Sequence, residues 1–356
     1  MPPVLEPPQV RLPRHRSKSS WPRRIGMACL RLVILGVVLG VGGGGYYLAK
    51  RGFGRQWRDR VVEELRKHGV EANIGRLTLD PFRGLIAKNV RIFDYKNRDN
   101  ILALISEVSL DINNYAALIH HEPFLNALDV RDAQIILPFK TADEKGDRAA
   151  LTNLRAHVYF PPEQIYVSQA EGVFCGIRIS ATGQLIRRDN YQASAALSAE
   201  EWRRRLLIVQ RAVSELQNFR FPATRPSLQI KFTGDVAELE KAHVEATLRG
   251  DRLQRGSYEI KDLSAIAEWN NQQLTIAHCE WSDHMGSFAG RANWNVQRSG
   301  ASLQMRSSLD LKAFLDAFGL GEPFAGIQFQ AAPAVEISGS VNFGSDRFRP
   351  DIIGHL

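Results

Sequence analysis

From Leu228 to Phe343 the chain alternates between apolar and polar residues over several short stretches. Successive side chains of a β-strand point to opposite faces of the sheet, so the alternation predicts antiparallel strands with one apolar and one polar face. Turn residues such as Gly250-Asp251 and Asn270-Asn271 separate the stretches at the spacing of consecutive hairpins. The apolar face either packs on a second sheet or lines a groove for an apolar ligand. The candidates for its lining are Phe232, Leu248, Phe288, Trp294, Met305, Leu309, Ile337 and Phe343.

Strand patterns also occupy most of the chain before this region. The expected strands span 72–80, 85–93, 102–112, 128–139, 156–160, 164–167, 174–181 and 191–197, with a charged loop at 141–150. The chain is therefore predicted to be mainly β.

The spacing of apolar residues becomes helical over 53–68. Phe53, Trp57, Val61 and Leu65 are four residues apart, and Gly69 follows where a helix would end. The rest of the helix surface is basic. Two interpretations are compatible: the helix lies on anionic lipid headgroups, or its apolar side caps an open end of the sheet.

A second helix is predicted over 198–219, where Ser198 and Glu201 form a capping box before an apolar stripe. This helix could gate a groove, with its arginines meeting lipid phosphate, or it could cover a sheet end with a solvated basic side. A shorter helix over 311–318 is expected to cap the sheet in a similar way.

The segment 25–48 carries a single charge, Arg31. As a helix it would extend about 36 Å, enough to cross a hydrocarbon core of about 30 Å. Arg31 would reach toward the headgroups, and Trp21, Tyr46 and Tyr47 fall where interfacial aromatic residues are found. No small-x-small cleavage site follows, so the pattern predicts an uncleaved signal-anchor rather than a signal peptide. Basic residues on both flanks leave the orientation of this helix open.

The formal net charge of +8 is concentrated at the amino terminus. Residues 1–25 hold six Lys or Arg against one Glu, so the rest of the chain carries only +3. A body so close to neutral lacks the basic face that phosphate neutralisation needs, which argues against nucleic-acid binding. The tail 1–24, rich in Pro and Arg, shows no apolar periodicity and is predicted to be disordered.

Residues suited to catalysis or metal binding are few. The sequence contains no G-x-S-x-G motif and no P-loop. The possible metal ligands lack the ordered spacing of a zinc motif, so we expect no metal, no cofactor and no enzymatic activity. Cys175 and Cys279 stand at strand-like positions and are expected to be buried thiols, although an oxidising compartment would allow them to pair. The metal candidates are His120, His121, Glu122, His278, Cys279, Glu280, Asp283 and His284.

The order of a short tail, one anchor helix, an amphipathic helix and then strands resembles the amino-terminal region of the AsmA-like family, which includes the TamB and YhdP type proteins of Gram-negative envelopes. In that family a strand ending near an Ile-Gly leads to a Gly-Leu and the next strand, and a further strand, a short helix and a last strand of alternating aliphatic residues follow. The resemblance covers residues 53–139. The matching positions are Gly75, Gly84, Asn89, Val90, Ile92, Asp94, Val108, Leu110, Leu128 and Val130.

The resemblance implies a single-pass inner-membrane protein with a cytoplasmic amino terminus and a periplasmic domain. Its fold would be an elongated antiparallel sheet, bent into a groove-like half-barrel with a few capping helices. Membrane lipids would be its ligands, and other envelope proteins its possible partners. The expected units are the tail 1–24, the membrane helix 25–48, the AsmA-like helix and strands 49–140, and the continued sheet 151–356 with a helical insertion at 198–219.

Two functions remain open from the sequence. One is a lipid-handling protein of envelope biogenesis, which shields or transfers acyl chains along the apolar face. The other is a non-enzymatic scaffold of an envelope or secretion complex, in which the sheet closes into a sandwich. Alternation cannot separate them, because a groove and a sandwich need the same pattern.

Overall fold

A computed structural model describes residues 52–67, 71–80, 83–93, 101–113, 124–140, 148–186, 210, 213–295, 300–322, 326, 333–343 and 348–355. The predicted tail, the predicted membrane helix and the predicted strand 191–197 lie outside these residues. The described helices are α2 (Arg55–Lys67), α5 (Leu311–Ala317) and a 3-10 helix (Val236–Lys241). The strands are β1 (Glu71–Asp80), β2 (Gly84–Phe93), β3 (Ile101–Asn113), β4 (Phe124–Lys140), β5 (Arg148–Tyr159), β6 (Gln164–Phe174), β7 (Ile177–Ile186), β8 (Phe219–Arg220), β9 (Ser227–Asp235), β10 (His243–Arg255), β11 (Tyr258–Asn270), β12 (Gln273–Ser282), β13 (Ser287–Asn295), β14 (Gly300–Ser307), β15 (Val335–Phe343) and β16 (Phe348–His355).

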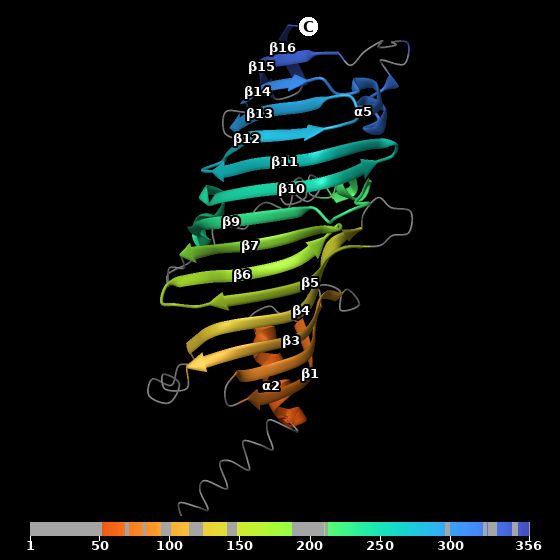
Figure 1. Cartoon of the computed structure of the whole chain (residues 1–356). Helices are drawn as coiled ribbons and strands as arrows, with labels where there is room; N and C mark the ends of the chain where they lie inside the picture. Colours follow the sequence, from red (N-terminus) through yellow and green to blue (C-terminus); the bar gives the residue numbers. More distant parts are fainter. Residues whose placement is uncertain are drawn as a thin grey trace, which may run out of the picture.

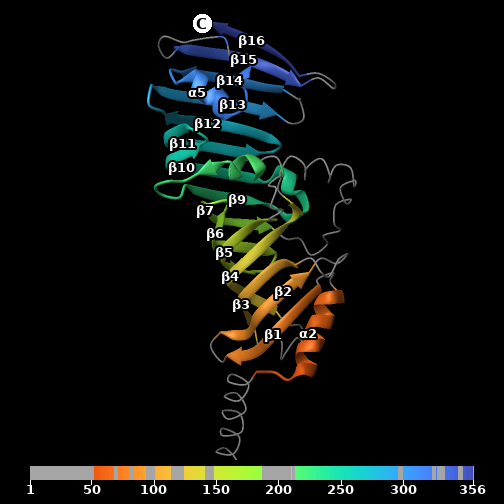
Figure 2. The ribbon, with the colours of Figure 1, turned by 90° about the vertical axis from the view of Figure 1, so that its right-hand side faces the viewer.

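All the described strands belong to one 16-stranded sheet, in which neighbours follow almost entirely in chain order from β1 to β16 (Figure 1). The path runs from β1 at one edge to β16 at the other without closing, so the sheet is open. Figure 2 shows the twist of this long sheet and α2 lying beside β1 and β2. The mainly β prediction is confirmed, whereas the described strands do not form the closed sandwich of the scaffold hypothesis.

One strand pair departs from the predicted antiparallel arrangement. β7 and β9 are parallel, with Ile179 beside Leu228 and Gly183 beside Phe232. Parallel neighbours require the chain to cross back along the sheet, and the connection between β7 and β9 does so. A helical turn at 213–217 belongs to this crossover, inside the helix predicted over 198–219. Its Val213 is buried against Ala149.

The strand predicted over 174–181 is wrong because a hairpin turn interrupts it. Cys175 and Gly176 both adopt left-handed backbone angles, with φ of 48° and 80°. Two such residues make the tight connection that suits two twisted antiparallel strands. Cys175 therefore lies in the turn between β6 and β7, where Gly176 avoids a clash with the ring of Phe221, which would lie 2.7 Å from an added Cβ.

A transverse line of left-handed residues crosses the first strands. Asn89 in β2, Asp132 in β4 and Asn153 in β5 have φ between 52° and 54°. Asn and Asp adopt this conformation more readily than other non-glycine residues. Each such residue shifts the alternation by one position, so that Ala87 and Val90, three residues apart, belong to the same apolar cluster. The apolar side chains before and after the line thus stay on one face, while the strands bend there as at a β-bulge.

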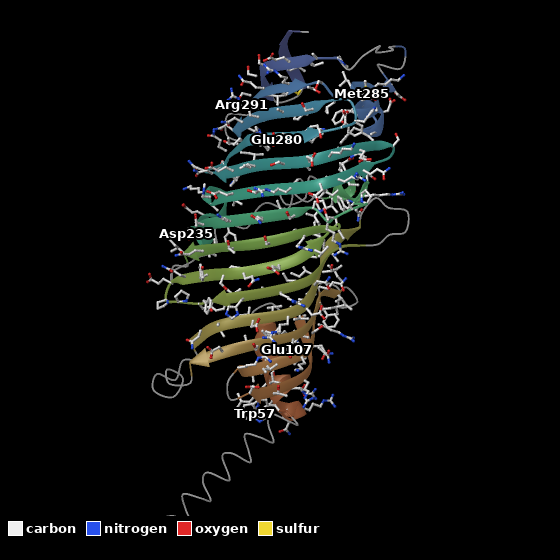
Figure 3. All side chains as sticks on the ribbon, in the orientation of Figure 1. Trp57, Glu107, Asp235, Glu280, Met285 and Arg291 are labelled. Carbon is white, nitrogen blue, oxygen red and sulfur yellow. The ribbon has the colours of Figure 1, made fainter. Side chains whose placement is uncertain are left out.

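The helix α2 packs its apolar side on the first strands, as the capping interpretation predicted. Trp57 is an exception: its side chain is 56% exposed (Figure 3). Positions four apart drift by about 40° around a helix of 3.6 residues per turn, so Trp57 lies to one side of the surface that Val61, Val62 and Leu65 present to the strands. The cluster consists of Phe53, Val61, Val62, Leu65, Ile74, Leu77, Leu85, Ala87, Val90, Ile92 and Ile105.

Candidate functional site

The strand registers align apolar residues into rows that cross the whole sheet. Paired residues on neighbouring strands point to the same face, so each row belongs to one side of the sheet. We call the side that carries both rows the apolar face. The first row is Leu77, Ala87, Val108, Val130, Ala156, Ala170, Ala181, Ile230, Ala246, Ala267, Ile276, Ala292, Leu303, Gly339 and Ile352. The second row is Leu79, Leu85, Leu110, Leu128, Val158, Val167, Gly183, Phe232, Val244, Trp269, Leu274, Trp294, Ala301, Val341 and Pro350.

The opposite side of the sheet is polar. A row between the two apolar rows consists of Thr182, Lys231, Glu245, Glu268, Thr275, Asn293, Ser302 and Ser340. No apolar residue interrupts this row from β7 to β15. The sheet is therefore two-sided, with one side suited to water and the other to hydrocarbon.

The apolar face is left largely open. Of the first-row residues whose burial is described, Leu77 and Ala87 alone are buried, and both lie under α2. Every other member with a described side chain is half-buried or exposed, up to 36% for Leu303. Among the second-row members whose side chains are described, none is fully buried, and Trp294 is 41% exposed. The cores of folded domains leave little such surface, because exposing large contiguous apolar areas to water is unfavourable.

A second packed cluster covers one end of strands β10 to β12 on this face. Its centre is Tyr258, which is only 2% exposed. The helix α5 contributes Phe314, and the ring of Trp281 on β12 stacks on that of Phe288 with centroids 3.8 Å apart. The cluster consists of Leu253, Tyr258, Ile260, Phe219, Phe221, Leu263, Trp281, Ala313, Phe314 and Ala317.

Arg255 fastens α5 and the crossover segment to this end of the sheet. Its Nε donates a hydrogen bond of 2.8 Å to the carbonyl oxygen of Ala317, and its side chain forms a 2.6 Å ion pair with Glu215. The guanidinium also lies 4.2 Å from the ring centroid of Phe318, a cation–π contact. The predicted capping role of the helix at 311–318 is thus confirmed by α5.

The predicted lining residues mostly share this face. Phe232 and Trp294 belong to the second row, and Met305 pairs with Ile337 in a third line that includes Leu248. The ring of Phe232 lies across Gly183, where an added Cβ would come within 2.6 Å of it. A glycine in a strand often marks such a close approach.

Leu309 and Phe343 differ from the other lining candidates. Leu309 follows the end of β14 and is 2% exposed, so it belongs to the packed base of α5 and not to the open face. Its spacing from Met305 continued the alternation although the strand had ended. Phe343 is the last residue of β15, and its side chain lies outside the described part of the structure. Phe288 is half-buried, and its ring stacks on that of Trp281.

The candidate metal ligands of β12 do not converge. His278 and Glu280 form a 3.1 Å ion pair on one face, whereas Cys279 pairs with Ala265 on the apolar face. Asp283 accepts backbone hydrogen bonds in the next turn, and His284 lies 3.6 Å from Asp310. Within the described ranges, no group of His, Cys, Asp or Glu is arranged to hold a metal ion. The other candidates, His120, His121 and Glu122, lie outside them.

The two cysteines are not joined to each other. Cys175 and Cys279 are both half-buried free thiols. Burial raises the pKa of each thiol above its ordinary value, so both are held in the unreactive protonated form.

The membrane-anchor candidates Arg31, Trp21, Tyr46 and Tyr47 lie outside the described residues. Among the helices that are described, none is both long and apolar enough to cross a membrane.

On the polar side, Glu107 is the centre of a charge network on β2 to β4. Lys88 lies 2.9 Å from its carboxylate, and Arg83 and Arg131 also contact it. Hydrogen bonds from Lys88 and then Arg83 lower the pKa of Glu107 from 4.5 to about 2. This carboxylate thus binds the first strands together across their solvated side.

We expect Glu107→Gln to lower the free energy of unfolding by about 1–2 kcal/mol at pH 7. Because the folded pKa lies below the unfolded one, the contribution of Glu107 is complete above about pH 4.5 and is lost as the pH falls toward 2. The free energies of unfolding from urea titrations at pH 7 and pH 3 should therefore differ less for the variant than for the natural protein. The exposed Glu171 provides the control, since Glu171→Gln should leave both titrations unchanged.

The sequence candidates covered only half of the surface. The prediction took its lining residues from β9 onward, whereas Leu110, Leu128 and Val158 continue the same row through β3, β4 and β5. These three residues could have been predicted as lining residues from the alternation of apolar and polar positions within their own strands. Comparison with protein-family models, with curated proteins and with solved structures finds no match to this chain.

Proposed function

We propose that this chain is a membrane-anchored envelope protein of AsmA-like type, which shields or transfers lipid along its apolar face and so contributes to envelope biogenesis. The observation that supports this most is the pair of apolar rows that cross the fifteen paired strands from β1 to β16, β8 excepted, and that remain largely open to solvent where their side chains are described. In the same proposal, the segment 25–48 anchors the protein in the inner membrane, with the amino terminus in the cytoplasm and the sheet in the periplasm.

The dimensions of the sheet suit this role. Neighbouring strands are about 4.8 Å apart, so the fourteen steps from β1 to β16 span about 67 Å. An acyl chain occupies one leaflet, about half of a 30 Å hydrocarbon core. Several chains could therefore lie in line along the rows.

The proposed mechanism is burial of hydrocarbon without bond making or breaking. Each methylene removed from water contributes about 0.8 kcal/mol, so burying even part of an acyl chain supplies several kcal/mol. Small side chains dominate the middle of the first row, including Ala156, Ala170, Ala181, Ala246 and Ala267. They leave room for a chain to lie against the backbone, and the polar headgroup would remain at the edge of the sheet.

A pair of photo-crosslinking residues tests the proposal in cells. A photoreactive residue at Ala267 faces the apolar side, and one at the adjacent Glu268 faces the polar side of the same strand. After irradiation of the full chain in its membrane, we expect phospholipid adducts from position 267 and none from position 268. A single protein partner captured at 267, with no lipid, would instead favour the scaffold function.

A further inference from the structure

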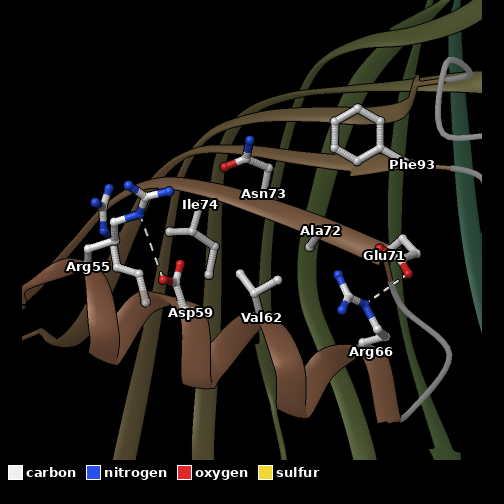
Figure 4. Close-up of a pocket in the computed structure, with 10 residues that line it drawn as sticks. Arg55, Asp59, Val62, Arg66, Glu71, Ala72, Asn73, Ile74 and Phe93 are labelled. Atoms are coloured by element: carbon white, nitrogen blue, oxygen red, sulfur yellow. Dashed lines mark hydrogen bonds and ion pairs between the residues drawn. The ribbon is translucent and has the colours of Figure 1, made fainter.

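A cleft of about 410 Å³ lies between α2 and the edge strand β1 (Figure 4). Three arginines from one side of α2, Arg55, Arg58 and Arg66, line it together with apolar side chains. A helix brings positions separated by three, eight and eleven residues to the same side, which explains why these guanidinium groups meet there. The cleft thus combines cationic walls with hydrocarbon.

The charges in the cleft do not cancel. Its carboxylates are Asp59 and Glu71, against three arginines. Arg66 pairs with Glu71 at 3.0 Å, while Arg55 is 3.9 Å from Asp59 with both side chains largely exposed, which makes that pair weak. The cleft therefore keeps one net positive charge and attracts anions.

Arg58 supplies the strongest indication of a ligand. One terminal nitrogen of its guanidinium donates to the carbonyl oxygen of Gly75. Its Nε is buried and has no hydrogen-bond partner among the residues that the structure describes. Leaving a buried donor unmet is unfavourable, and a rotation of the guanidinium toward the cleft would let a phosphate oxygen accept a charge-assisted hydrogen bond from it.

The floor of the cleft continues into the apolar face. Val62 of α2 and Ala72 and Ile74 of β1 form this floor. Ala72 and Ile74 pair with Ile92 and Val90 on the apolar side of β2. A molecule whose anion sits among the arginines could thus extend an apolar tail in the direction of the apolar rows.

We propose that the cleft between α2 and β1 binds the phosphate of a phospholipid headgroup, at the end of the apolar face whose elements follow the predicted membrane segment in the sequence. This inference rests on the proposed function and adds to it the place where a lipid is first held. A phospholipid headgroup and free inorganic phosphate would both be recognised through a phosphate group. The lipid is favoured over free phosphate because apolar side chains, among them Val62, Ala72 and Ile74, also line the cleft.

The test measures binding to the full chain in neutral maltoside micelles, with dihexanoylphosphatidic acid and inorganic phosphate as probes. Arg58→Gln should weaken binding of the lipid probe about tenfold. Arg55→Gln should weaken it about threefold, and its 87% exposed side chain can be changed without disturbing the packing of α2. Arg60→Gln is the matched control on the same helix, because its guanidinium lies over Trp57, 5.3 Å from the ring centroid, and does not line the cleft.

The expected result is that the lipid probe binds more tightly than inorganic phosphate and that only the cleft variants lose it. Equal affinity of the two probes would overturn the assignment to a lipid, and unchanged lipid binding in both cleft variants would overturn the site. Crosslinking from Ala267 separates this inference from the proposed function. If position 267 still captures lipid while the cleft variants bind the probe normally, the cleft assignment fails and the proposed function stands.

Discussion

A glutamate in place of Ala246 is expected to reduce the phospholipid bound to the full chain at least tenfold while leaving the protein folded. Ala246 lies in the middle of β10, with Ile230 and Ala267 as its cross-strand neighbours in the first apolar row. A carboxylate at this position must keep its water, and stripping that water to admit an acyl chain costs several kcal/mol. Since each 1.4 kcal/mol is a factor of ten in affinity, little lipid should remain.

The fold should tolerate this change because Ala246 is only half-buried, so the new carboxylate can stay hydrated in the lipid-free protein. The matched control is Thr247→Glu, the next residue of the same strand, which pairs with Gln229 on the opposite side. Native mass spectrometry of both variants, with thermal unfolding as the fold check, gives the comparison. Full lipid loading of Ala246→Glu would mean that lipid is held somewhere other than the apolar face.

Much of the sheet could be predicted because alternation is a local property. The predicted strands 72–80, 85–93 and 102–112 agree with β1, β2 and β3 to within one or two residues. The alternation did not reveal that its phase changes at Asn89 and Asp132, since a left-handed residue inside a strand looks in the sequence like any polar position. Only the register across several strands shows that these residues form one line.

The parallel pair of β7 and β9 could not be predicted from local pattern either. Strand direction depends on where the chain returns after residue 186, and the sequence of a crossover does not specify that. The turn at Cys175-Gly176 was missed for a different reason. The apolar residues Phe174 and Ile177 flank it closely, so the two strands looked like one.

The sequence predicted several residues that line the candidate site, but it did not predict that the face carrying them is open. Phe232, Trp294 and Met305 were found because each faces the apolar side of its own strand. Whether that side is covered depends on contacts between distant segments, and the same alternation serves a packed sandwich as well as an open sheet. Leu309 continues the alternation after its strand has ended, so its pattern looks like that of the lining residues although it is buried just before α5.

Asp283→Ala is expected to lower the free energy of unfolding by about 3–5 kcal/mol, the largest effect on stability that we predict. Asp283 is 8% exposed and lies between β12 and β13. Its carboxylate accepts hydrogen bonds from the backbone nitrogens of Met285, Gly286 and Asp310, at 2.7 to 2.8 Å, and from the Tyr258 hydroxyl at 3.0 Å. Alanine would leave all four donors without this acceptor and would release the start of α5 from the sheet. Urea unfolding followed by tryptophan fluorescence measures the loss.

Two milder variants show whether the carboxylate acts through these bonds. Tyr258→Phe removes one donor and should cost about 1 kcal/mol, whereas Asp283→Asn keeps the shape but puts an amide N–H against a donor and should cost an intermediate amount. Burial raises the pKa of Asp283, but the four hydrogen bonds outweigh it and lower the pKa below 3.8. Its contribution is therefore present above about pH 3.8 and is lost as the pH falls through the folded pKa, and Asp283→Asn should remove that part of the acid sensitivity. If Asp283→Ala unfolds at the same urea concentration as the natural protein, these bonds do not hold α5 to the sheet.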